Sequence, residues 1–119
     1  MDIEVLFLLS EYDRTADPER LQEADKLSEW LYENNQNNPN HVYLLNRYQT
    51  LLRQRSLHEE EIEKLIEISE SAKSEEIDKV GAYLLLGNQT SAKFHMKRLT
   101  GESRNQLLEL PISHFLDRK

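Results

Sequence analysis

Apolar residues recur at spacings of three and four positions along almost the whole chain, beginning with Ile3, Leu6, Leu9 and Tyr12. This is the period of amphipathic α-helices, and no segment of useful length alternates as a strand would. Only three glycines and three prolines interrupt the 119 residues. The pattern therefore predicts an all-α protein. The predicted helices span about 2–13, 18–34, 40–55, 57–71, 75–87 and 91–99, with short helical pieces near 102–109 and 112–117.

Helix start and stop signals lie between these apolar runs. A side chain that accepts a bond from a free backbone N–H favours a helix start, and a proline fits the first helical position because that position needs no N–H. Glycine is typical of a helix end. The predicted starts are at Asp17 with Pro18, Asn38 with Pro39, the capping-box pattern from Ser56 to Glu59, Ser74 and Thr90, and the predicted ends are at Gly87 and Gly101.

The helices repeat in pairs. Displaced by 35 positions, the apolar row Val42, Leu45, Tyr48 and Leu51 falls on Ile77, Val80, Tyr83 and Leu86. The helices that follow these two match at a displacement of 34, and the first helix matches at 39. Agreement of both helices of a pair is stronger than a single match, because the loop between them must also agree in length. We therefore expect one domain of three helix pairs, over residues 1–37, 38–73 and 74–100, followed by a helical cap over 101–119.

Two helices in a unit of about 34 residues are typical of the tetratricopeptide repeat family. Residues 37–40 resemble the linker between its repeats, Val80 and Gly81 resemble the apolar-glycine pair midway along its first helix, and residues 87–92 resemble its turn. The resemblance implies stacked antiparallel helix pairs, a short right-handed α-solenoid with a concave surface that docks a peptide or a partner helix. An irregular helical bundle is the alternative architecture.

The distribution of charge along the chain limits the classes of partner that the protein is expected to bind. The net charge is −7, and residues 1–87 carry 19 acidic and 9 basic side chains. Such a body repels phosphate backbones, which argues against nucleic acid. A cytoplasmic protein is expected because the chain has no cysteine, no apolar run long enough for a membrane, and acids near its N-terminus where a signal peptide needs bases. The basic cluster lies near the C-terminus and comprises Lys93, His95, Lys97, Arg98 and Arg104.

Side chains for catalysis or metal binding are sparse. No two of the four histidines have metal-ligand spacing, so we expect no metal, no cofactor and no catalytic residue. Arg53 and His58 are separated by four residues, as in the small all-helical ribonucleases of the HEPN family, where such a pair would activate a ribose hydroxyl. A ribonuclease that uses these two residues is the alternative to a non-enzyme.

A non-catalytic module that binds a protein or peptide is the function we expect. Residues one position past the core row of each first helix should face the groove, and the strongest candidates are Tyr43, Arg47, Thr50 and Leu85. The first helix is apolar nearly all round, so Phe7 or Leu8 should stay exposed and contact a second copy or a preceding domain. In the case of a preceding domain, the chain would be a regulatory or C-terminal segment of a larger protein.

Overall fold

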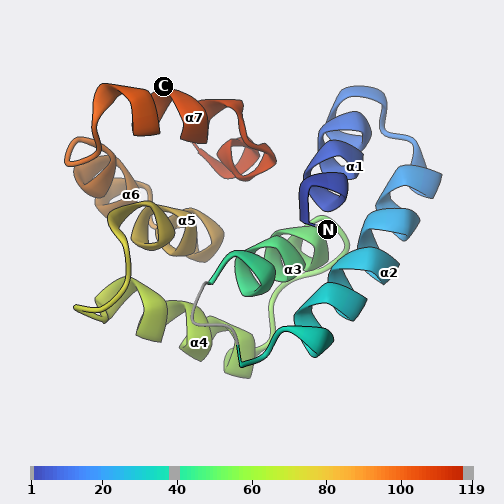
Figure 1. Ribbon diagram of the computed structural model, residues 1–119, viewed down its shortest axis with the longest axis horizontal. Helices are drawn as coiled ribbons and strands as arrows, with labels where there is room; N and C mark the ends of the chain where they lie inside the picture. The colour runs from blue at the N-terminus through green and yellow to red at the C-terminus, as the bar shows by residue number, and fades with distance from the viewer. Residues whose placement is uncertain (1, 38–40, 117–119) are drawn as a thin grey trace. The chain divides into compact units, whose positions relative to one another are not determined.

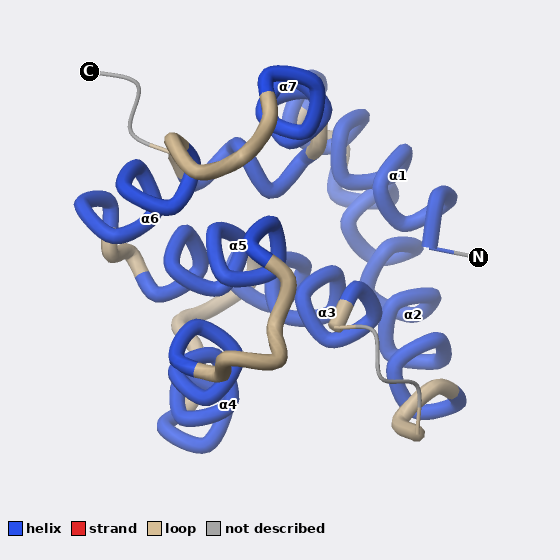
Figure 2. Tube along the Cα trace, turned by 60° about the vertical axis from the view of Figure 1, so that its left-hand side comes forward, coloured by secondary structure: helices blue, strands red, loops and turns tan. Residues whose placement is uncertain are grey.

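The computed structural model describes residues 2–37 and 41–116, and within them every regular element is a helix (Figures 1 and 2). The all-α prediction is confirmed, and the helices begin and end within a few residues of the predicted positions. The elements are α1 (Asp2–Thr15), α2 (Pro18–Asn34), α3 (Val42–Leu52), α4 (Glu59–Glu70), α5 (Glu76–Leu86), α6 (Gln89–Met96), α7 (Gly101–Glu109) and the 3-10 helix η1 (Pro111–Phe115).

Two of the predicted helix signals are used as expected. The Asp17 carboxylate accepts a bond of 3.0 Å from the N–H of Glu19, and Pro18 is the first residue of α2. Gly87 ends α5 with a positive φ of 77°, a conformation that costs glycine little because it has no Cβ. The predicted start at Asn38 and Pro39 lies outside the described residues.

Three other signals are used differently from the prediction. The N-cap of α4 is His58 rather than Ser56, and its N–H donates to the Glu61 carboxylate at 2.7 Å. The run of three glutamates offers the reciprocal bond at more than one register, so the local pattern left the start ambiguous. Asn88, rather than Thr90, caps α6, and Gly101 begins α7 after a Thr100 cap instead of ending a helix.

The chain divides into two compact units, residues 1–56 and 57–119. In the first unit α1 and α2 form a helical hairpin whose connection contains only Ala16 and Asp17, and α3 packs against both helices. In the second unit α5 is central and packs against α4, α6 and η1, while α7 packs against η1. The boundary between the units lies inside the predicted repeat 38–73, and the repeat boundaries stay a prediction.

The apolar rows of the sequence predict that five residues share one continuous core, and all five are buried. Leu45 and Tyr48 of α3 lie in the first unit, and Leu65, Val80 and Leu84 lie in the second. Each comes from the apolar row of its helix, so the phase of these helices is as the sequence predicts. Their membership of one continuous core stays a prediction.

Replacing Leu45 or Leu65 with alanine should lower the free energy of unfolding by about 2–5 kcal/mol, because each change removes buried methyl groups and leaves a cavity. Denaturant titration followed by circular dichroism measures the loss. Glu63→Ala, at an exposed position of α4, is the control and should stay within about 0.5 kcal/mol of wild type. Equal small effects at all three positions would contradict the assigned helix phases.

Candidate interaction surfaces

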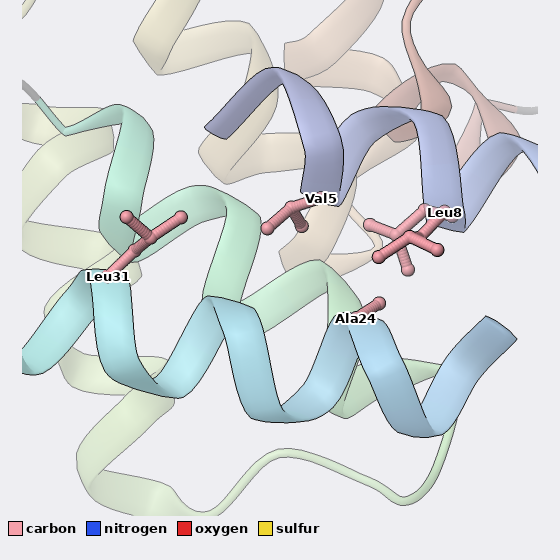
Figure 3. Close-up of a cluster of buried hydrophobic side chains, with 5 residues drawn as sticks. Val5, Leu8, Ala24 and Leu31 are labelled. Atoms are coloured by element: carbon pink, nitrogen blue, oxygen red, sulfur yellow. The ribbon is translucent and has the colours of Figure 1, made fainter. Parts of the chain in front are cut away.

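The α1–α2 hairpin has its own apolar core. Figure 3 shows Val5 and Leu8 of α1 directed toward Ala24 and Leu31 of α2. Leu9 completes this buried cluster, and Leu21, Leu27 and Tyr43 pack against it from its edges. The cluster fixes which sides of α1 and α2 face inward, and therefore which side chains point out.

Ile3 and Phe7 lie on the outward side of α1. They are 67% and 61% exposed, and they are four residues apart, so they share one face of the helix. Leu8 follows Phe7 by one residue, a turn of about 100°, which carries it into the core. The prediction that either Phe7 or Leu8 stays exposed is thus met by Phe7, whereas Leu8 is buried.

Trp30 of α2 is a third large apolar residue on the outside of this unit, at 60% exposure. The side of α2 that meets α3 is marked by Asp25, Ser28 and Glu29, all of which bond to Arg47. Successive residues turn by about 100°, so Trp30 projects away from α3. Trp30 was not among the predicted surface residues, although its position one residue before Leu31 of the apolar row was a usable signal.

Tyr43 and Arg47 were expected to face a partner, and the structure gives both an internal use. Tyr43 packs at the edge of the hairpin core. The Arg47 guanidinium donates to the Asp25 carboxylate at 2.6 Å and to the Glu29 carboxylate at 3.2 Å. A bond of 2.9 Å to the Asp25 carbonyl adds to these contacts and ties α3 to α2. Arg47 is thus engaged in holding the first unit together.

Thr50 and Leu85, the other two predicted contact residues, are buried. The Thr50 hydroxyl donates to the Asn46 carbonyl at 2.8 Å, within α3 itself. Two further buried polar side chains share this face of α3, since Gln49 donates to the Asn46 side-chain oxygen at 3.0 Å. The Asn46 side-chain nitrogen is buried without a hydrogen-bond partner among the described residues. The binding role of all six predicted residues stays a prediction, and only Phe7 presents a well-exposed side chain.

Arg53 and His58, the pair considered for RNA cleavage, have different environments. Arg53 donates through Nε and Nη2 to both oxygens of Asp13 at 2.8 and 2.7 Å, and through Nη1 to the Gln49 carbonyl at 2.9 Å. Its side chain is only 2% exposed. His58 lies in the other unit and is exposed at the start of α4. All three guanidinium nitrogens of Arg53 are therefore already engaged in joining α3 to α1.

A cluster of aromatic and charged side chains joins α5 and α6 in the second unit. The His95 ring stacks on Tyr83 with centroids 5.2 Å apart and planes at 16°. Its Nδ1 contacts the Glu76 carboxylate, which also pairs with Arg98 at 3.6 Å. Because Tyr83 and Glu76 come from α5, these contacts orient α6 and set which of its side chains face outward.

Phe94 is the residue that this arrangement places on the surface. It is 57% exposed, and the Arg98 guanidinium lies over its ring at 6.0 Å from the centroid. Lys97 is exposed on the same helix end. Arg104, counted with them in the basic cluster, instead donates to the carbonyls of Met96 and Leu99 at 3.2 and 3.3 Å and so closes the C-terminal end of α6. Phe94 was not among the predicted surface residues, although it stands two residues past the buried Ala92 and therefore off the apolar row of its helix.

No group of three metal-ligating side chains comes together within residues 2–37 and 41–116. None of the described helices combines the length and the apolar character that crossing a membrane would require. Comparison with protein-family models, with curated proteins and with solved structures found no match. The exposed surfaces described above are therefore the features from which a function can be inferred.

If Arg53 has a structural role, it should couple energetically to Asp13. In a double-mutant cycle with Asp13→Ala and Arg53→Ala, we expect a coupling of about 1–3 kcal/mol in the free energy of unfolding, because the pair is bidentate and the arginine is buried. Denaturant titration of the four proteins measures the coupling. A value near zero would show that the two side chains do not depend on each other.

Purified protein should leave single-stranded RNA intact over hours, because the Arg53 guanidinium is bonded to Asp13 and Gln49 and its side chain is only 2% exposed. Gel electrophoresis of a labelled oligonucleotide provides the measurement. Cleavage that disappears in the Arg53→Ala, His58→Ala double variant, but persists in Arg20→Ala, would establish the ribonuclease instead.

Proposed function

We propose that the protein is a non-catalytic protein-interaction module, and that the outward side of the α1–α2 hairpin docks an apolar stretch of a partner protein. The exposure of Ile3 and Phe7 at successive turns of one helix is the observation that carries this proposal. Exposed large apolar groups that share one helix face are typical of contact surfaces, because water contact with them is unfavourable. Trp30 adds a residue type that often dominates binding energy.

The finer architecture that we propose is a tetratricopeptide-like stack of helix pairs. Its support is the internal repeat of apolar rows, together with the packing of α1 against α2 and of α5 against α6, which are the first and third of the expected pairs. In such a stack the first helix has a neighbour on one side only, which accounts for apolar residues on its outer side. A preceding domain or a second copy would cover them.

Phe7→Glu should weaken partner binding by at least tenfold, because a carboxylate would have to lose water in an apolar contact, at a cost above about 1.4 kcal/mol. Wild-type and variant proteins are immobilised, captured proteins are identified by mass spectrometry, and each candidate is then titrated as purified protein. Gln22→Glu adds the same charge to an exposed site on α2 and is the matched control. Identical capture and affinity for all three proteins would exclude this surface.

The version in which the partner is a second copy is tested by sedimentation of the same proteins. Wild type should then associate and Phe7→Glu should sediment as a monomer. A monomer in both cases rules out the dimer through α1 and leaves a preceding domain or a different protein as the occupant.

A further inference from the structure

Two oppositely charged, partly apolar surfaces occur on separate helices of the second unit. On α4, Ile62 and Ile66 are 38% and 39% exposed and lie four residues apart. Successive residues turn by about 100°, so Glu59, Glu63 and Glu70 follow them on the adjoining part of the exposed face. We name Glu59, Ile62, Glu63, Ile66 and Glu70 the acidic face of α4.

On α6 the exposed side has the opposite charge. Phe94 is exposed there, and the Arg98 guanidinium lies over its ring. The exposed Lys97 follows directly after Met96, the last residue of the helix. Lys97 takes part in no side-chain ion pair among the described residues, and the Arg98 side chain is 60% exposed despite its contact with Glu76. We name Phe94, Lys97 and Arg98 the basic face of α6.

The two faces belong to helices on different sides of α5. Both α4 and α6 pack against this central helix with their buried rows, which contain Leu65 and Ile68 in α4 and Ala92 and Met96 in α6. Their exposed faces turn away from those rows, so one face is not used to cover the other within the unit. Within the second unit, each face is therefore open to a second molecule.

We propose that the acidic face of α4 in one copy of the chain docks on the basic face of α6 in another copy. The complementarity is twofold, since acids oppose bases and Ile62 and Ile66 offer an apolar surface to Phe94. The charges would orient the encounter, and the exposed ion pairs would contribute about 0–1 kcal/mol each. The ion pairs and the apolar contact would together give only a weak affinity, so the loss of either should abolish detectable association.

The contact joins two different surfaces, so it is head-to-tail. Such contacts continue from one molecule to the next unless the rotation between copies closes a ring. It is independent of the α1–α2 surface, which lies in the other unit. The expected behaviour is a weak association that grows with protein concentration and is reversed by salt, which screens charges beyond about 3 Å at 1 M.

Sedimentation velocity of the full chain tests this, from about 10 µM to about 1 mM, the range in which weak contacts populate complexes. The weight-average sedimentation coefficient of wild type should rise with concentration at low salt and return to the monomer value at about 1 M salt. Phe94→Ser, Lys97→Glu and Glu63→Lys should each stay monomeric. Circular dichroism and thermal melting verify that each variant is folded.

The decisive sample is the equimolar mixture of Lys97→Glu with Glu63→Lys. Each variant alone opposes like charges. In the mixture, each contact between the two different variants again joins an acid to a base, so association should return through these mixed contacts. The control is Arg20→Glu with Lys26→Glu, which alters two exposed bases of α2 and should associate as wild type does.

A monomeric wild type at every concentration overturns the proposal, as does an association that Lys97→Glu and Phe94→Ser retain. Association lost in Phe7→Glu but kept in Phe94→Ser would assign it to α1 and also overturn the proposal.

Discussion

The constraint on which this structure depends is that most helices in the described part of the chain are too short to be stable alone. The longest, α2, has 17 residues and the shortest α-helix, α6, has 8. Isolated helices of this length are marginal in water, so each must gain its stability by burying one side against a neighbour. Adjacent helices along the chain do this for one another, α1 with α2, α2 with α3, α4 with α5 and α5 with α6. A narrow apolar row on each helix is sufficient for that purpose.

A narrow row also explains why several large apolar side chains remain outside. Phe7, Trp30 and Phe94 each stand one or two positions away from a buried residue of their own helix, at Leu8, Leu31 and Ala92. The turn of about 100° per residue moves them off the buried side. Their apolar surface therefore contributes little to folding as described, which makes binding the simplest use for it.

Some arginines of this chain hold helices together, whereas another is exposed over an aromatic ring. The amino-acid composition does not distinguish these two uses. Arg47 and Arg53 tie α3 to α2 and to α1 through carboxylates, and Arg104 satisfies carbonyls at the end of α6. The Arg98 side chain is 60% exposed, and its guanidinium lies over Phe94. The planar group with several donors suits both uses, since it can bond to carboxylates or carbonyls and also lie over an aromatic ring. Only the position of the neighbouring helices decides which use applies.

The sequence by itself determined the helical class, the approximate limits of the helices and the buried rows, because these follow from local periodicity and from caps such as Asp17 with Pro18. It could not determine which residues beside those rows are free to bind. Tyr43 and Arg47 satisfied the positional rule for a groove, yet Tyr43 packs on the hairpin core and Arg47 reaches carboxylates 18 and 22 residues away. Thr50 and Leu85 are buried, whereas Phe94 is exposed without having been singled out. The side of a helix that meets a neighbour depends on contacts between residues distant in sequence, and only the tertiary structure decides them.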